Sequence, residues 1–500
     1  MLSSRLDAVA EPDAAVVYCE WTMEFKNVSS QQREARAQVA VPPGAVVSRV
    51  TLWIDGEERE AAFGPRAQTR AAYREVAVGF PVPANGGVMK VKPGITAPLL
   101  LDSTERGQFV CPRFLERNFS VPSSLRHELW IASPQRLSIG EVEAAKPVSP
   151  EKPFTLRNSW SEAEISRTIK AITVDRDGQV KDVWTAAADG NEYIQQRIEP
   201  SAMAAIRRLV LVLDGSEGMD SFAWQLSEAI TSLPNHIELK LLIANDSASS
   251  RDNRATTFQP ERVDAIQRRL SRAQFQGGQD NLPTLLAAWD LASAVEGGAV
   301  LWVHGPTPVL LSAESGLIQR LERNTTRTRL FEAQTVAGPD RILEKLDGRS
   351  SLRTVPRVKS LREDLAHWVA QWNGNALQFE FKREKTTTRP SGVQGSRHIE
   401  RLWARDESLR LAQTRKTEEA TKLAVKNQLV TPVSGAVVLE RKEQYDRHKL
   451  TPAGPETVPS VPEPTALSLV GVGLLAIAMA RKRAARLARA KNPPSQRDPA

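Results

Sequence analysis

The sequence predicts a mixed fold: an all-β, sandwich-like N-terminal region, a doubly wound α/β domain, and a single apolar C-terminal helix. In residues 10–135, short stretches alternate apolar and polar side chains between turns rich in Pro and Gly, as β-strands do. In residues 206–358, apolar runs alternate with amphipathic helical patterns, which indicates parallel strands joined by helices. Residues 465–480 form an uncharged run after a Pro-rich stretch.

Composition and charge are those of an ordinary multidomain protein. The length of 500 residues suggests about two or three domains. Contents of 41% hydrophobic and 25% charged residues are typical of globular chains. The net charge is +8, but +6 of it lies after Pro464, so the rest of the chain carries only +2. Because no nucleic-acid-binding motif accompanies this charge, we expect no nucleic-acid partner.

The chain has two cysteines, Cys19 and Cys111. They are too few for a disulfide framework or a cysteine metal site. Both lie in strand-like stretches, so we expect buried free thiols, with a single bridge between them as the alternative.

Residues 10–135 carry several short motifs at strand ends and turns: Phe25-x-Asn27, Val41-Pro42-Pro43-Gly44-Ala45, Trp53-Ile54-Asp55-Gly56 and Ala71-Ala72-Tyr73. Pro fixes φ and Gly permits positive φ, so the Pro-Pro-Gly stretch is a turn between two strands. Together the motifs resemble the VIT domain, the β module of inter-α-trypsin inhibitor heavy chains and vault proteins, which implies a β-sandwich-like module. The stretch 78–81 joins the predicted helix almost directly to the next strand, so we expect a shortened module with an open sheet edge.

After a β-rich connector at 136–205, an apolar run at 209–213 ends at Asp214. Five apolar residues in a row fit a strand buried on both faces of a parallel sheet. Asp214 then lies at the carboxyl end of the strand, where open α/β sheets bind ligands. Asp214 and Ser216 could offer oxygens to a hard cation such as Mg²⁺. The alternative is a strand-ending turn whose aspartate caps the next helix.

This arrangement resembles the von Willebrand factor A domain, whose metal-ion-dependent adhesion site opens with Asp-x-Ser-x-Ser. Asp214 and Ser216 match, but Gly218 replaces the second serine. After a glycine pair, Gln279 stands near the family's threonine, and His304 takes the position of its second aspartate. Because ligand charge sets hard-cation affinity, we expect weak Mg²⁺ binding or none, and no other cofactor. The resemblance implies a degenerate metal site formed by Asp214, Ser216, Gln279 and Asp280.

Residues 359–445 are predicted to return the chain to the N-terminal region. A helix at 360–372 and a strand at 376–381 precede a long helix at 398–426, which is rich in Arg, Glu and Ala. The stretch 429–440 contains Thr431-Pro432 and a strand-like run. It resembles the closing segment of chains that combine VIT and von Willebrand A domains, in which this element packs back on the body.

The C-terminus changes character at residue 446. A Pro-rich linker, 446–464, ends in Pro462-Glu463-Pro464 and precedes the uncharged run 465–480. Prolines fix φ and cannot continue a helix, so we expect an extended peptide at Glu463. The basic tail 481–500 opens with Arg481-Lys482-Arg483. This order resembles the PEP-CTERM sorting signal, which implies an exosortase-type processing enzyme as a partner.

The apolar run is predicted to be a single transmembrane helix. At ~1.5 Å per residue it spans ~24 Å, and snorkelling arginines can complete the ~30 Å hydrocarbon core. Positive charge after the helix places the C-terminus in the cytoplasm and the domains outside, at the bacterial membrane or cell envelope. Such export needs a signal, and Met1–Ala10 has no apolar core of signal-peptide length. We therefore expect a missing upstream portion, and the alternatives are a misplaced start or domains that stay in the cytoplasm.

The sequence indicates no enzyme. Its six histidines form no zinc motif, and it has neither a Gly-x-Ser-x-Gly elbow nor a P-loop. We expect a non-enzymatic bacterial cell-envelope protein, in which the von Willebrand A-like domain binds a protein or another envelope partner. The alternative is a membrane-anchored scaffold component of the exosortase or exopolysaccharide machinery. Cleavage of the tail would favour the first hypothesis, and permanent retention the second.

Overall fold

The computed structural model describes residues 1–54, 56–76, 82–145, 152–167, 170–202, 205–245, 252, 254–346, 351–355, 357, 359–372, 377–454, 457 and 459–461. The chain divides into two units, Met1–Pro459 and Ser460–Ala500. The predicted sorting tripeptide, apolar run and basic cluster lie outside the described residues. Within the described ranges, no helix combines the length and the apolar character that a membrane crossing requires.

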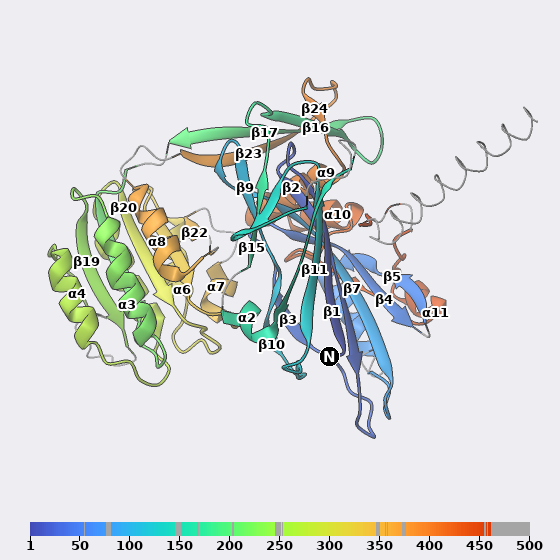
Figure 1. Cartoon of the computed structure of the whole chain (residues 1–500), viewed down its shortest axis with the longest axis horizontal. Coiled ribbons are helices and arrows are strands. Elements are labelled where there is room, and N and C mark those ends of the chain that lie inside the picture. Colours follow the sequence, from blue (N-terminus) through green and yellow to red (C-terminus); the bar gives the residue numbers. More distant parts are fainter. Residues whose placement is uncertain are drawn as a thin grey trace, which may run out of the picture. The chain divides into compact units, whose positions relative to one another are not determined.

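The N-terminal region is built on a seven-stranded sheet in the order β14-β11-β1-β2-β7-β4-β5 (Figure 1). Strand β1 is an interior strand that pairs antiparallel with β2 and parallel with β11. The sheet therefore joins strands that are far apart in the sequence. Its strands are β1 (Ser3–Glu11), β2 (Val16–Lys26), β4 (Val46–Ile54), β5 (Glu57–Glu60), β7 (Val88–Pro98), β11 (Arg126–Ser133) and β14 (Phe154–Ser161).

A second sheet, in the order β13-β12-β15-β9-β8, shares a buried core with the first. Trp21 and Ile131 of the first sheet and Phe109 and Ile172 of the second belong to this core. The region is rich in β-strands and also contains a helix, and the VIT assignment stays a prediction. Cys19 and Cys111 are buried in the core as free thiols. The strands are β8 (Leu100–Ser103), β9 (Arg106–Val110), β12 (Leu137–Ile139), β13 (Val142–Glu143) and β15 (Ala171–Asp175).

Smaller elements complete the N-terminal region. Strands β3 (Ala37–Ala40) and β10 (Arg113–Arg117) form a separate antiparallel pair. Helix α1 (Arg66–Val76) follows β6 (Ala62–Pro65), and α2 (Glu162–Arg167) follows β14. The helix formers at 67–75 thus do form a helix, as the sequence indicates.

Strand β1 begins before residue 10, where the β region was predicted to start. Ser4, Leu6, Ala8 and Ala10 point alternately inward and are buried. This period-two pattern was present in the sequence, but three of its four inward residues are small or polar and carry little hydrophobic signal. The first ten residues are therefore part of the fold.

The α/β domain contains a five-stranded parallel sheet in the order β19-β18-β20-β21-β22. Helices cover both faces, as the strand–helix alternation predicts: α3, α4 and α8 pack on one face and α5, α6 and α7 on the other (Figure 1). The strands are β18 (Arg208–Asp214), β19 (Glu238–Ala244), β20 (Gly298–His304), β21 (Arg329–Gln334) and β22 (Leu352–Thr354). The helices are α3 (Asp220–Ala229), the 3₁₀ turn η1 (Ile230–Ser232), α4 (Val263–Arg272), α5 (Asn281–Ala292), α6 (Ser315–Glu322), α7 (Arg341–Leu346) and α8 (Leu361–Ala370).

The limits of this domain differ from the predicted range of 206–358. Helix α8 buries Leu361, Leu365 and Val369 in the core on one face of the parallel sheet, so it belongs to the domain. Nor do residues 136–205 form a separate connector, because β14 and β15 belong to the two N-terminal sheets.

The α/β domain is flanked by two strands that pair with each other. β17 (Tyr193–Ala202) runs antiparallel to β23 (Leu377–Thr386) from Tyr193↔Thr386 to Ala202↔Leu377. Strands β16 (Asp182–Ala186) and β24 (Val393–Gln394) extend this sheet. The chain therefore leaves the body at the end of β17 and returns beside it at the start of β23.

The elements from α9 onward pack on the N-terminal region. Helices α9 (His398–Gln413) and α10 (Thr417–Lys426) contribute Ile399, Leu402 and Ala424 to a core shared with Val16 and Val46. The predicted long helix 398–426 is wrong, because Arg415 has φ +62° between them. Strand β25 (Ser434–Val437) pairs with β6, and α11 (Lys442–Arg447) follows.

Candidate functional site

The candidate site lies where β18 and β20 end, side by side in the parallel sheet. In the order β19-β18-β20, the strand that follows β18 in the sequence lies on one side of it, and the next strand lies on the other side. The carboxyl end of β18 is therefore the topological switch point, where open α/β sheets bind ligands. Asp214 ends β18 and His304 ends β20. The sequence located this edge correctly.

Asp214 is buried and organises its own turn. Its Oδ1 accepts hydrogen bonds from the Ser216 backbone N–H at 3.0 Å and the Ser216 hydroxyl at 2.6 Å. Its Oδ2 accepts one from the Gly305 N–H at 3.2 Å, which links the ends of β18 and β20. The residue at the N-cap of α3 is Met219, which makes no side-chain cap. Asp214 therefore stabilises a strand-ending turn, but it does not cap the next helix.

The other predicted site residues surround this turn. The Ser216 hydroxyl oxygen accepts a hydrogen bond from the Gln279 N–H at 2.9 Å. Asp280 caps α5 by accepting from the Leu282 N–H at 3.1 Å, and its second carboxylate oxygen accepts from the Ser312 hydroxyl. The structure thus brings Asp214, Ser216 and Gln279 into one hydrogen-bonded chain, while the side chain of Asp280 serves the helix.

His304 occupies the centre of a buried charged cluster. It is fully buried, and its ring stacks on Trp302 with centroids 3.6 Å apart. Its Nε2 lies 3.4 Å from Glu332 Oε2. Its Nδ1 lies 2.8 Å from the Gly305 carbonyl oxygen and 3.1 Å from Asp340 Oδ2. The contact with Asp340 is an ion pair.

The carboxylates decide the charge of His304. Burial alone lowers the pKa of an imidazole, but contact with Asp340 and Glu332 raises the pKa of His304 to about 10. The ring is therefore an imidazolium at neutral pH. Glu332 and Asp340 were missed from the sequence. Of the two, only Glu332 could have been noticed in the sequence, because it is a charged residue inside the short apolar stretch that forms β21.

These residues do not fit a metal ion. Both oxygens of Asp214 accept hydrogen bonds from the protein, Oδ1 from Ser216 and Oδ2 from the Gly305 N–H, and the imidazolium of His304 stands at the end of the neighbouring strand. No group of three or more His, Cys, Asp or Glu suited to a metal occurs in the described part of the chain. Gly218 has φ +85°, a conformation that strains a serine, so the backbone itself disfavours the missing ligand.

We accordingly expect the full chain to bind Mg²⁺ weakly or not at all, since charge count sets hard-cation affinity. Isothermal titration calorimetry with MgCl₂ measures this directly, and Asp214→Ala serves as the control for the site. A micromolar affinity that Asp214→Ala abolishes would contradict the expectation.

Comparison with solved structures finds von Willebrand A proteins among the similar ones. A von Willebrand factor type A protein from Catenulispora acidiphila is 13% identical, with 39% of this chain and 47% of that chain covered and a TM-score of 0.28. Manganese-loaded TRAP protein of Plasmodium vivax is 14% identical, with 39% of this chain and 83% of that chain covered and a TM-score of 0.23. The pilus adhesin SpaC of Lactobacillus rhamnosus GG, in its open conformation, is 10% identical, with 36% of this chain and 31% of that chain covered and a TM-score of 0.25.

These likenesses establish no function for this chain, which spans about half the length of the first of them. No curated protein matches the sequence. The family model of the PEP-CTERM protein-sorting motif, by contrast, matches residues 460–483. The resemblance drawn from Pro462-Glu463-Pro464 and the residues after it is thereby confirmed.

Proposed function

We propose that this chain is a non-enzymatic protein of the bacterial cell envelope that an exosortase-type enzyme processes at its C-terminus. The observation that supports this most strongly is the PEP-CTERM motif match over 460–483. In this proposal the apolar run 465–480 is a single membrane span, and Arg481-Lys482-Arg483 keeps the C-terminus in the cytoplasm. The folded body is then held outside, next to the membrane.

We assign protein binding, rather than catalysis, to the α/β domain. Asp214 and His304, at the ends of β18 and β20, are buried and bound to other residues of the domain. Val309 and Leu311, on the loop that follows β20, have 64% and 62% of their surface exposed. In this proposal Val309 and Leu311 supply the apolar part of the surface that contacts the partner. The partner is an envelope or extracellular protein.

The processing step is tested by changing Pro462, Glu463 and Pro464 together to alanine. In a host that carries an exosortase, we expect the wild-type chain to lose the residues after the motif, and we expect the triple variant to keep them. The physical reason is that two prolines exclude helix and present an extended peptide to the enzyme. Intact-mass spectrometry of the purified chain distinguishes the two forms.

A matched control is Pro493→Ala with Pro494→Ala, which makes the same chemical change beyond the basic cluster. It should be processed as the wild type is. If wild type and triple variant both retain residues 465–500, the sorting proposal fails. The chain would then be a permanently anchored protein, as expected for a scaffold of the exosortase or exopolysaccharide machinery.

A further inference from the structure

The segment before the sorting motif is bound to the folded body, although the sequence predicts a free linker. We call residues 451–459 the C-terminal strap; the structure describes 451–454, 457 and 459 of it. The Ala453 N–H donates to the Ala61 carbonyl oxygen at 3.0 Å, and Pro452 bridges to Ala62. The strap therefore begins as an extension of the β6 edge.

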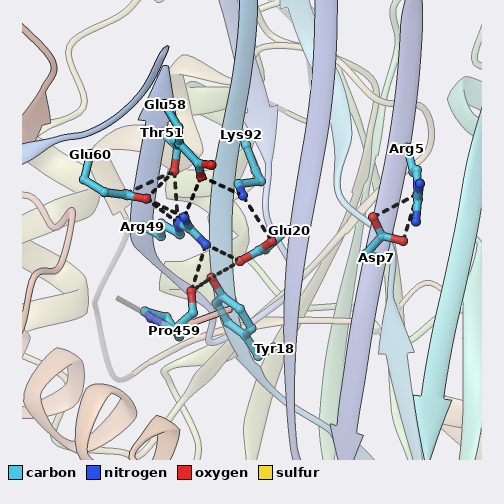
Figure 2. Close-up of polar contacts among 10 residues, drawn as sticks. All are labelled: Arg5, Asp7, Tyr18, Glu20, Arg49, Thr51, Glu58, Glu60, Lys92 and Pro459. Atoms are coloured by element: carbon cyan, nitrogen blue, oxygen red, sulfur yellow. Dashed lines mark hydrogen bonds and ion pairs between the residues drawn. The ribbon is translucent and has the colours of Figure 1, made fainter. Parts of the chain in front are cut away.

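Two further positions of the strap are held by side chains of the body. The Thr457 carbonyl oxygen accepts from Arg401 Nη2 at 3.1 Å, and its hydroxyl oxygen accepts from Gln428 Nε2 at 2.7 Å. The Pro459 carbonyl oxygen accepts from the Tyr18 hydroxyl and from Arg49 Nη1, each at 3.1 Å. Figure 2 shows Pro459 beside Tyr18 and Arg49.

The four anchoring residues come from distant parts of the fold. Tyr18 lies on β2, Arg49 on β4, Arg401 on α9, and Gln428 two residues after the end of α10. Tyr18, Arg49 and Arg401 are all buried when the strap is bound. The anchor exists only when the N-terminal sheet and the C-terminal helices are assembled.

The anchor at Pro459 can open without leaving a buried donor unpaired. The Tyr18 hydroxyl and Arg49 Nη1 both also donate to Glu20 Oε1, at 3.1 Å and 2.7 Å. Both donors keep this acceptor when the Pro459 carbonyl departs. An unsatisfied buried donor is the main cost of breaking such contacts, and here that cost is avoided.

The anchor at Pro459 limits the distance between the sorting motif and the surface of the folded body. From Pro459 to Glu463 there are four residues, which span at most ~14 Å at ~3.6 Å per residue. A small domain is ~30 Å across, so an enzyme with its active site at Glu463 would collide with the body. If the strap opens back to Ala453, ten residues are free and the reach becomes ~36 Å.

We propose that the C-terminal strap is a gate on processing: while Tyr18, Arg49, Arg401 and Gln428 hold it, the exosortase-type enzyme cannot reach the motif. This inference rests on the proposed function for its consequence, whereas the strap itself can be tested separately. Release of the strap from the folded body is then a required step before cleavage.

The first test removes two of the four side-chain contacts with Tyr18→Phe and Gln428→Asn. Phenylalanine keeps the ring stacked on His398, and asparagine tolerates the φ of +57° at position 428 but is too short to contact Thr457. Arg5→Gln is the control, since it breaks the Arg5–Asp7 pair, which lies apart from the strap in Figure 2.

Hydrogen–deuterium exchange of the full chain in detergent reports on the strap without any enzyme. We expect peptides covering 451–461 to be protected in the wild type and in Arg5→Gln, and to exchange several-fold faster in the double variant. If these peptides exchange as fast in the wild type as in an unfolded chain, the strap is not held and the proposal is wrong.

Pulse–chase measurement in the exosortase host reports on the gate. A second variant inserts eight Gly and Ser residues between Pro459 and Ser460, which lengthens the reach and leaves both anchor and motif intact. We expect processing to become several-fold faster in the double variant and in the insertion variant, and to be unchanged in Arg5→Gln. Unchanged or slower processing in the insertion variant would overturn the gate, even where exchange confirms the strap. If no variant is processed at all, the proposed function fails and the gate with it, while the exchange result still decides whether the strap is held.

Discussion

Replacement of Arg49 by methionine should lower the free energy of unfolding by about 3–5 kcal/mol, the cost of removing one partner from a buried ion pair. Arg49 contacts Glu20 at 2.7 Å and Glu58 at 2.9 Å, and it also pairs with Glu60 (Figure 2). Burial alone would lower its pKa, but hydrogen bonding to Glu60 and the nearby carboxylates raise the pKa of Arg49 above its ordinary value. The group therefore stays charged in the folded state.

Without Arg49, Glu20 and Glu58 would keep Lys92 as a partner, at 3.6 Å and 3.2 Å, whereas Glu60 would lose the guanidinium with which it pairs. Glu20 and Glu60 are too buried for water to replace the guanidinium, with side chains only 7% and 12% exposed. Differential scanning calorimetry of the full chain measures the loss. Arg5→Gln removes an ion pair whose arginine is 44% exposed, so it should cost only ~0–1 kcal/mol. Equal effects of the two substitutions would contradict this account.

Replacement of His304 by leucine should destabilise the α/β domain by a similar amount, about 3–5 kcal/mol. Leucine fills much of the space beside Trp302, but it leaves Glu332 and Asp340 buried without the cation between them. Thermal unfolding at pH 7 tests this. The control is His236→Gln, which changes an exposed histidine and should shift stability by less than ~0.5 kcal/mol.

The same cluster predicts how stability depends on pH. The folded-state pKa of His304 is raised to about 10, above the value of about 6.5 for an unfolded chain. The stabilisation is therefore fully present below pH ~6.5 and is lost as pH rises toward 10. We expect the difference in unfolding temperature between wild type and His304→Leu to shrink steadily over this range. A constant difference from pH 6.5 to 10 would show that His304 is not charged in the folded protein.

Much of the fold could be predicted from local pattern. The run 209–213 is buried on both faces of the parallel sheet, as five consecutive apolar residues indicate. Strand pairing could not be predicted in this way. The pairing of β17 with β23 joins residues whose separation reaches 193 positions, as in Tyr193↔Thr386, and no local pattern encodes such a partner.

The candidate site shows the same limit. The spacing of Asp214 and Ser216 correctly predicted an oxygen-rich turn at a strand end, because the turn is local. The role of His304 was beyond sequence reasoning, because its charge depends on Glu332 and Asp340, which lie 28 and 36 positions further along the chain. Only the assembled sheet brings these carboxylates to the imidazole.

The pairing of β17 with β23 has a mechanical consequence. The last pair, Ala202↔Leu377, places the two ends of the α/β domain on the same rung of one antiparallel ladder, about 5 Å apart. Tension applied to the chain on the two sides of the α/β domain, at β17 and at β23, would pass through the hydrogen bonds between these strands and bypass the domain. The α/β domain is therefore outside this load path, and its fold does not have to resist a force that acts between β17 and β23.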